Sequence, residues 1–409
     1  MHLVFLIAEI LCFSYFAFFR RRFDLFAIAN LGAAFYMLPL FVGRIPKVGT
    51  DGLLIRELMD LDPRVYVFGY AVIIAPTLTG ILYDQFMPAA RKQRPDRSYA
   101  GWYLLLALIG IAVHLSTSPL FFANKATTLE HIGFFYTLFE TAISLAVLDA
   151  FKNRRWWLFA VAVCLLVLDV TVGFRFNLVL VAIGCVLLWL SEKGPIRLSS
   201  RLHIYSLLAL TLLVVGVAAN PIRVYGVKVT FQYFTGPIGF YNEFFRLEPF
   251  ATQSIANESF RKELSCRPFN WRQFALLVVP LSRLLDVQPQ LFEAEYKPLF
   301  PDVKFGLAGN PWAEAFCRDG WVGFALTLAF FTMLLVALQL TLDFGFGPAP
   351  AVALCGIIVA FYVHRNDAYF LLILLRRIAI LAVVVWTLRL LSGATRRWID
   401  QYRTQMSIW

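Results

Sequence analysis

Two adjacent arginines, Arg376 and Arg377, lie in the middle of an otherwise apolar stretch at residues 369–386, which reads YFLLILLRRIAILAVVVW. A guanidinium group at the centre of a bilayer costs about 2.5 to 3.5 kcal/mol on insertion scales, so two of them require partners. Arginine stays charged and holds phosphate through a planar fork of donors, which makes an anionic ligand one explanation. An internal salt bridge to an acidic residue is the other.

The position of Arg365 favours a ligand for Arg376. Arg365 precedes it by eleven residues, which is close to three helical turns, so both lie on one face about 16 Å apart if the helix is continuous. This spacing suits a long anionic ligand that enters from outside. Arg377 is rotated from that face by about 100°, and for it we expect an internal ion pair. The acidic candidates for that pair are Asp169, Asp367 and Glu140.

Composition indicates a bilayer as the environment of these charges. Hydrophobic residues make up 60% of the chain and charged residues only 15%, with a mean hydropathy of +0.69. These values exclude an ordinary soluble domain. We predict an all-α polytopic membrane protein with about eleven transmembrane helices. The predicted spans are residues 3–19, 23–42, 65–86, 99–121, 132–151, 156–172, 174–190, 203–219, 321–341, 348–363 and 368–391.

Lysine and arginine fall in alternate loops, and basic residues accumulate on the cytoplasmic side of membrane proteins. We therefore predict an exterior N-terminus and a cytoplasmic C-terminus. Four regions result: helices 1 to 8 in residues 1–219, a large exterior loop at 220–320, helices 9 to 11 in 321–391, and a cytoplasmic interfacial tail at 392–409. Membrane anchoring accounts for most of the net charge of +11, so nucleic acid is not expected as a partner.

The large exterior loop is expected to cover the membrane surface as a lid rather than to form a separate domain. Its apolar stretch at 271–285 is too short to span, so we place it in the interface or as a re-entrant element. Cys266 and Cys317 are the two cysteines of this loop. In an oxidising compartment they could pair and tie the loop to the ninth span, and two buried thiols are the alternative.

Polar residues gather at the exterior ends of the predicted spans. They are Asp169, Arg175, Arg223, Glu314, Arg318, Asp319, His364, Arg365, Asp367, Arg376 and Arg377. Glu140 lies in the middle of the fifth span, and we expect it to bond a neighbouring helix rather than to catalyse. The acidic run at 60–62, DLD, is interpreted as a solvated loop rather than a metal-dependent transferase motif. No spacing of His or Cys indicates a metal site.

Two stretches resemble bacterial O-antigen polymerases. Residues 306–331, GLAGNPWAEAFCRDGWVGFALTLAFF, are similar to the acidic, aromatic and Gly-aromatic-x-Gly pattern at the start of a late span in that family. The arginine after a glycine in VGFRFNLVLVAIG, at 172–184, is also similar. The resemblance implies a C-type membrane glycosyltransferase in the bacterial inner membrane, with its active site facing the periplasm and with neither metal nor cofactor. It would transfer a growing glycan from undecaprenyl diphosphate to a new lipid-linked repeat unit.

This reaction needs a base for the attacking sugar hydroxyl and positive charge for the departing diphosphate. The candidate bases are Asp319, Glu314 and Asp367. Each could instead cap a helix or pair with Arg318. The candidates for holding the diphosphate or substrate are Arg175, Arg223, Arg318, Arg365 and Arg376, with Tyr241 and Phe245 of the aromatic stretch 231–250 expected to stack on sugars. The implied partners are the lipid-linked donor and acceptor, membrane lipids and a chain-length regulator.

Two other functions fit the same features. O-antigen ligases have a similar layout but usually carry a histidine where this chain has Asn310. A lipid-linked oligosaccharide flippase or transporter would be equally hydrophobic. Transporters usually show two similar halves, whereas this chain has eight predicted spans, one long loop and three more spans.

Overall fold

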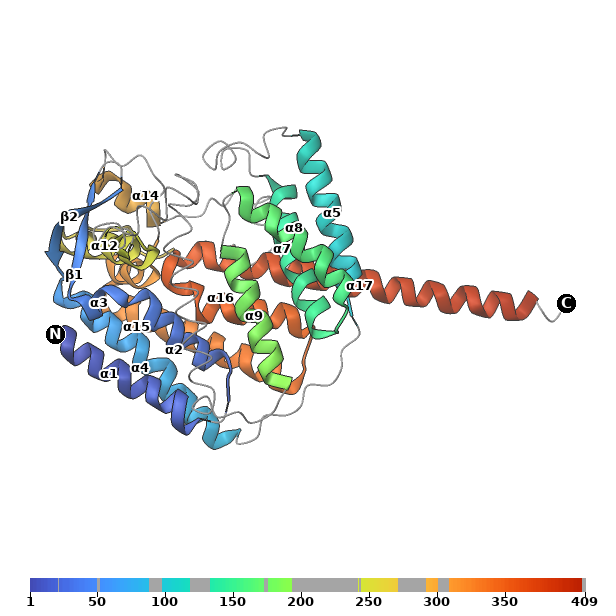
Figure 1. Ribbon diagram of the computed structural model, residues 1–409, viewed down its shortest axis with the longest axis horizontal. Coiled ribbons are helices and arrows are strands. Elements are labelled where there is room, and N and C mark those ends of the chain that lie inside the picture. The colour runs from blue at the N-terminus through green and yellow to red at the C-terminus, as the bar shows by residue number, and fades with distance from the viewer. Residues whose placement is uncertain are drawn as a thin grey trace, which may run out of the picture. The chain divides into compact units, whose positions relative to one another are not determined.

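The computed structural model of the chain is mostly helical, and its described part contains one two-stranded sheet (Figure 1). The structure describes residues 1–20, 22–49, 52–87, 98–117, 133–172, 176–192, 242, 244–270, 292–300 and 309–406. Contacts divide the chain into two units. The first unit comprises Met1–Arg91, Lys193–Gln339 and Ile358–Ile373, and the second comprises Lys92–Glu192, Leu340–Ile357 and Leu374–Trp409.

Six helices in the described part of the chain are long and apolar enough to cross a membrane. They are His2–Phe19, Pro63–Phe86, Ala100–Thr117, Phe134–Lys152, Pro311–Phe344 and Ala368–Ser392. Four shorter apolar helices, at Leu25–Tyr36, Trp156–Asp169, Phe176–Ser191 and Ala349–Ala360, coincide with four further predicted spans. The span predicted at 203–219 lies outside the described residues. The chain therefore has the character of an all-α membrane protein, and the total of eleven spans stays a prediction.

The first unit is built on three helices that pack against one another. They are α1 (His2–Ser14), which continues as a π-helical turn (Tyr15–Phe19), α2 (Leu25–Tyr36) and α4 (Pro63–Phe86). The unit also contains α3 (Leu38–Val42), α12 (Glu248–Arg261), α14 (Phe292–Tyr296) and a 3-10 turn at Lys297–Leu299.

The side chain of Arg20 connects the start of α2 to the end of α4 through ion pairs with two carboxylates. Its Nη1 donates to Asp24 Oδ1 at 2.7 Å, and its Nε and Nη2 donate to the two carboxylate oxygens of Asp84 at 2.8 and 3.0 Å. Asp24 also caps α2 by accepting two backbone N–H groups of the first turn. Arg20 is thus a buried ion-pair partner of both carboxylates.

A β-hairpin that sequence analysis did not predict connects α3 to α4. It consists of β1 (Arg44–Gly49) and the antiparallel β2 (Gly52–Asp60), with an irregularity between Pro46 and Lys47. Figure 1 shows α12, in yellow, beside this hairpin.

Helix α12 comes from the predicted exterior loop and is almost wholly buried in the first unit. Its polar side chains bond backbone groups of neighbouring elements: Ser254 Oγ donates to the Pro46 carbonyl at 2.7 Å, and Gln253 Nε2 donates to the Tyr36 carbonyl at 3.2 Å. Such bonds satisfy polar groups that burial would otherwise penalise. This part of the loop is therefore integral to the first unit.

Helix α15 (Pro311–Phe344) contains a sharp break at Asp319 and Gly320. Gly320 has φ 61° and ψ −150°, a conformation that only glycine adopts readily. The break directly precedes residue 321, where the ninth span was predicted to begin. The helix before it, which carries Glu314 and Arg318, thus forms a separate segment in front of the long apolar helix.

The chain between α16 (Ala349–Ala360) and α17 (Ala368–Met406) is not a continuous helix. A 3-10 turn at Tyr362–Arg365 is followed by Asn366 in an extended conformation, φ −119° and ψ 160°. The eleven-residue spacing of Arg365 and Arg376 therefore does not place them on one helical face, because the continuity it assumed is absent. Helix α17 itself runs unbroken through most of the predicted tail.

The second unit contains a group of helices that pack on α7. They are α5 (Ala100–Thr117), α7 (Phe134–Lys152), α8 (Trp156–Val172) and α9 (Phe176–Glu192). Helices α5 and α7 approach closely at Gly110, where a Cβ atom would lie 2.8 Å from the Phe135 carbonyl oxygen. Asp149 Oδ2 caps the start of α5, accepting the backbone N–H groups of Tyr99 and Ala100 at 2.8 Å each.

Candidate functional site

Glu314, Arg318 and Asp367 meet in the first unit, and we refer to them as the Glu314–Arg318–Asp367 cluster. Asn310 starts α15, because its Oδ1 accepts the backbone N–H groups of Trp312 and Ala313 at 3.1 Å each. The helix that follows places the glutamate and the arginine four residues apart on one face. All three members of the cluster are buried.

Glu314 and Arg318 form a buried ion pair. Arg318 Nε donates to Glu314 Oε1 at 3.0 Å, and the other carboxylate oxygen accepts the backbone N–H of Ala368 at 2.9 Å. The glutamate therefore connects α15 to the first residue of α17. The charge of Asp367 also acts on this pair, so the three groups form one electrostatic unit.

Asp367 caps α17. Its Oδ1 accepts the backbone N–H of Phe370 at 2.7 Å, and the backbone of Phe292 also bonds its carboxylate. Burial raises the pKa of Asp367, and these two bonds and the charge of Arg318 oppose that rise only in part. A carboxylate with raised proton affinity is the type of group that general base catalysis uses.

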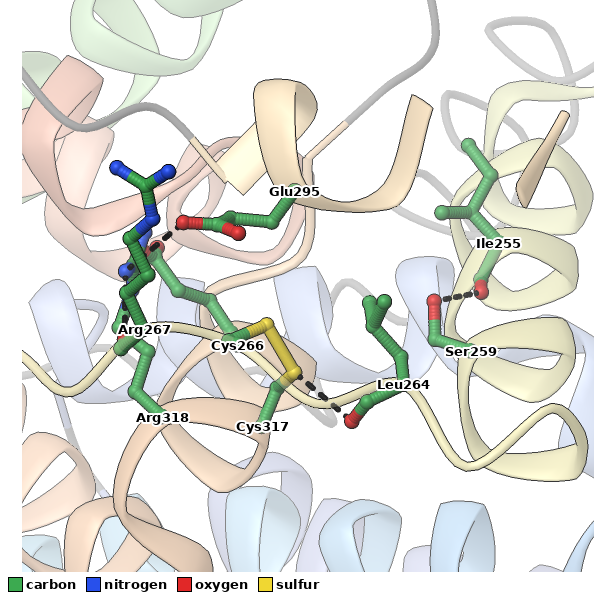
Figure 2. The surroundings of a disulfide bond; sticks show 9 residues. Ile255, Ser259, Leu264, Cys266, Arg267, Glu295, Cys317 and Arg318 are labelled. Carbon is green, nitrogen blue, oxygen red and sulfur yellow. Dashed lines mark hydrogen bonds and ion pairs between the residues drawn. A yellow bond between two sulfur atoms is a disulfide. The ribbon is translucent and has the colours of Figure 1, made fainter. Parts of the chain in front are cut away.

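Segments of the predicted exterior loop contact Arg318 of the cluster (Figure 2). Arg318 Nη1 donates to the Arg267 carbonyl at 3.1 Å and lies 4.0 Å from Glu295 Oε1 of α14. The disulfide Cys266–Cys317 joins the residues next to Arg267 and Arg318, so of the two alternatives for these cysteines the structure has the bonded one. The cross-link thus holds the loop segment at Arg267 close to the side chain of Arg318, which donates to the Arg267 carbonyl.

Two aromatic residues of the same loop also lie in this region. Phe269 stacks on Tyr369 of α17 with ring centroids 5.3 Å apart. Tyr296 of α14 is buried, and burial together with the nearby charges of Glu293, Asp367 and Glu314 raises the pKa of its hydroxyl. These aromatic residues were not predicted, because the sequence of a loop of this length contains no pattern that shows which distant segments pack together.

His364 lies next to the cluster in the 3-10 turn before α17. Its Nδ1 accepts a hydrogen bond from Trp312 Nε1 at 3.1 Å, so the imidazole is neutral with its proton on Nε2. Burial lowers the pKa of His364 from 6.5 to about 3. A group that is uncharged and enclosed in this way supports α15 through Trp312.

Acid is expected to destabilise the protein through His364. The unfolded chain takes up a proton near pH 6.5, whereas the folded chain does not until the pH approaches about 3. The free energy of unfolding should therefore fall as the pH decreases from 6.5 towards 3, by about 2 kcal/mol at pH 5. Unfolding of the detergent-solubilised protein across this range measures the slope. The variant His364→Gln should lose this part of the slope, and an unchanged slope would contradict the prediction.

Arg365 pairs with the first turn of α12. Its Nε forms an ion pair with Glu248 Oε1, and its Nη1 donates to the Tyr362 hydroxyl. The guanidinium carbon also lies 5.4 Å from the centroid of the Tyr362 ring. Arg365 is thus already charge-compensated within the first unit, so an anionic ligand would have to compete with Glu248.

The remaining predicted site residues have separate locations. Asp319 is exposed at the break in α15, outside the buried cluster. Phe245 is buried against Phe244 and Phe250, with 4% of its surface exposed, so stacking on a sugar would require it to leave this aromatic cluster. Arg376 belongs to the second unit and is half-buried in α17. The residues outside the described part of the chain are Arg175, Arg223 and Tyr241.

A second buried polar cluster lies within the second unit. Asp169 accepts hydrogen bonds from the Tyr136 hydroxyl at 2.6 Å and from Asn177 Nδ2 at 2.9 Å, and the same amide lies 3.3 Å from Glu140 Oε1. Glu140 therefore bonds a neighbouring helix, as predicted. The charge of Arg377 acts on Glu140, which supports the expectation of an internal partner for that arginine.

The acidic run at 60–62 has a structural role. Asp62 caps α4 by accepting the backbone N–H of Arg64 at 2.9 Å and pairs with its guanidinium at 2.8 Å. Within the described residues, no group of three or more His, Cys, Asp or Glu side chains is arranged to hold a metal ion.

Comparison of the chain with models of protein families, with curated proteins and with solved structures finds no match. The Glu314–Arg318–Asp367 cluster and its surroundings are therefore the basis for inferring a function.

Proposed function

We propose that this protein polymerises undecaprenyl-diphosphate-linked oligosaccharide repeat units at the periplasmic face of a bacterial inner membrane. It acts as a C-type membrane glycosyltransferase with eleven transmembrane helices and a large exterior loop. The growing glycan moves from its lipid diphosphate to the non-reducing end of a new lipid-linked repeat unit. The product is O-antigen or a related surface polysaccharide.

One observation carries this proposal. Glu314, Arg318 and Asp367 were expected to serve the reaction, and although they come from segments about 50 residues apart, they share one buried cluster. Both functional types that the reaction needs are present there: a carboxylate with raised proton affinity and a guanidinium held in a fixed orientation. The ends of two long apolar helices supply them, which is where a lipid-linked substrate would present its diphosphate.

In the proposed reaction, Asp367 accepts the proton of the attacking sugar hydroxyl. The hydroxyl oxygen forms the new glycosidic bond to the anomeric carbon of the donor, and the bond from that carbon to the diphosphate oxygen breaks. Arg318 and Arg365 stabilise the departing lipid diphosphate, since arginine binds phosphate through two parallel N–H groups. Glu314 positions Arg318 and is not required to take up a proton.

Asp367→Asn is expected to lower polymer formation by about a hundredfold or more, because general base catalysis contributes at least that factor. Asparagine caps helices as well as aspartate does, so α17 should still form. The measurement is the glycan ladder made from a lipid-linked repeat unit by the full chain reconstituted in vesicles, together with the amount of protein inserted. Normal ladders from well-inserted Asp367→Asn would remove this residue from the reaction.

Two further variants make this test specific. Asp62→Asn introduces the same change at the cap of another helix, α4, and should leave the ladder unchanged. Asp319→Asn examines the one exposed carboxylate among the three candidate bases. If it abolishes the ladder while Asp367→Asn does not, the base is Asp319.

The same reconstitution separates polymerase from the other two functions. Longer glycans on the lipid carrier indicate a polymerase, whereas transfer of a single glycan to lipid A core indicates a ligase. Movement of the lipid-linked unit across the membrane without elongation indicates a flippase or transporter.

A further inference from the structure

We propose that the second unit binds an anionic phospholipid in a cavity between the end of α7, the start of α8 and the end of α9. This site is independent of the proposed polymerase activity, because it uses none of the residues of the Glu314–Arg318–Asp367 cluster. Its ligand is a lipid phosphate with its acyl chains, taken from the surrounding membrane.

The cavity has a volume of about 690 Å³ and combines basic, aromatic and apolar walls. Lys152 and Arg154 provide the basic part, and Trp156 and Trp189 provide the aromatic part. Val186 and Leu188 line the side formed by α9. None of the described lining residues is acidic, so the cavity presents positive charge beside an apolar surface. That combination matches a phosphate headgroup joined to acyl chains.

Arg154 occupies a backbone conformation that favours glycine. Its φ is 56°, in the left-handed region, and the N–H of Arg155 bonds back to the Ala150 carbonyl at 2.8 Å to close the end of α7. Glycine is the usual residue at such a position, because a side chain there is strained. An arginine at this turn is therefore less favourable for folding than a glycine would be. Binding of a charged ligand in the cavity would explain why an arginine is found there.

Lys152 adds a largely buried charge at the same end of α7. It is 9% exposed, and its charge acts on Asp149. That carboxylate already accepts three hydrogen bonds at Oδ2 from residues 98–100, which it uses to cap α5. Asp149 thus has a structural task of its own at the start of α5.

The tryptophans favour a lipid over a soluble anion. Trp156 is 59% exposed and Trp189 is 39% exposed, and tryptophan is enriched where a membrane protein meets the headgroup region. The basic loop after α7 belongs to the side predicted to be cytoplasmic, where anionic lipids attract lysine and arginine. Basic pockets between transmembrane helices on that side are a known mode of anionic headgroup binding.

The test is native mass spectrometry of the full chain in neutral detergent, titrated with phosphatidylglycerol or with phosphatidylcholine of the same acyl chains. We expect a saturable phosphatidylglycerol adduct and weaker phosphatidylcholine binding. Arg154→Gly should weaken phosphatidylglycerol binding by about fivefold, the effect of one basic residue near the headgroup. Because glycine suits this backbone conformation, the thermal unfolding temperature should stay equal or rise, which separates lost binding from misfolding.

Two matched variants and one soluble ligand complete the experiment. Lys152→Gln should weaken binding as Arg154→Gly does. Arg155→Gln removes the neighbouring charge, which does not line the cavity, and should leave the affinity unchanged. Glycerol 3-phosphate should not compete if the acyl chains contribute. Equal affinity for the two lipids, or equal losses from Arg154→Gly and Arg155→Gln, would overturn the proposal, and full competition by glycerol 3-phosphate would show a phosphate site instead of a lipid site.

Discussion

Arg318→Ala is expected to destabilise the protein by about 3 to 5 kcal/mol, because it leaves the charge of Glu314 buried without its partner. Glu314 is 1% exposed, and its ion pair with Arg318 lies at 3.0 Å between Nε and Oε1. The same change removes the bond to the Arg267 carbonyl that holds the exterior loop segment. Membrane abundance and the unfolding temperature in detergent should both fall, and polymer formation should fall with them.

A paired variant separates the structural role of this ion pair from its proposed function. Replacing a buried ion pair by uncharged residues of similar size is often neutral for stability. The double variant Glu314→Gln/Arg318→Met should therefore recover most of the abundance lost in Arg318→Ala. We expect it to form no polymer, since the guanidinium is absent. A double variant that polymerises normally would show that the pair serves only to hold α15.

Local features of the sequence indicate parts of the two buried polar clusters. Asn310 directly before Pro311 is a typical start of a helix, and α15 begins there, ten residues before the predicted start of the ninth span at 321. The pairing of Cys266 with Cys317 was accessible because these are the two cysteines of the predicted exterior loop. Glu140 required a polar partner in an apolar helix, which Asn177 supplies.

The contacts that complete the site come from distant segments and have no local signal. Ala368 bonds Glu314 across 54 residues, and Arg267 bonds Arg318 across 51. A helical period shows which residues share a face, but it does not show which loop covers that face. For this reason the sequence identified the charged members of the cluster and missed Glu295, Tyr296 and the segment around Phe269.

Two features that were predicted wrongly or not at all have local signals in the sequence. The sequence of the β-hairpin at 44–60 contains Asp51-Gly52, whose glycine is the first residue of β2, and Asp-Gly flanked by strand residues is a strong hairpin signal. Asn366 and Asp367 are typical residues for the start of a helix, and they precede α17. Recognising that start would have shown that Arg365 and Arg376 do not belong to one continuous helix.

Loss of the disulfide is expected to cost about 4 kcal/mol of stability, because its two cysteines are separated by 51 residues and cross-linking a loop of that length restricts the unfolded chain. Loss of the disulfide should also disturb the Glu314–Arg318–Asp367 cluster. Cys266 and Cys317 adjoin Arg267 and Arg318, so the cross-link keeps the Arg267 carbonyl within 3.1 Å of the guanidinium (Figure 2). Reductant should therefore lower both the unfolding temperature and polymer formation of the wild-type protein.

The variant Cys266→Ser/Cys317→Ser identifies the bond responsible. It should have the low unfolding temperature of the reduced wild-type protein and should not respond further to reductant. Cys164→Ser, which changes an exposed free thiol, should behave like the wild-type protein under both conditions. If reductant lowers the unfolding temperature of the double variant as much as that of the wild type, the effect arises elsewhere. If reduction lowers stability but leaves the glycan ladder unchanged, the disulfide stabilises the exterior loop without positioning Arg318 for the reaction.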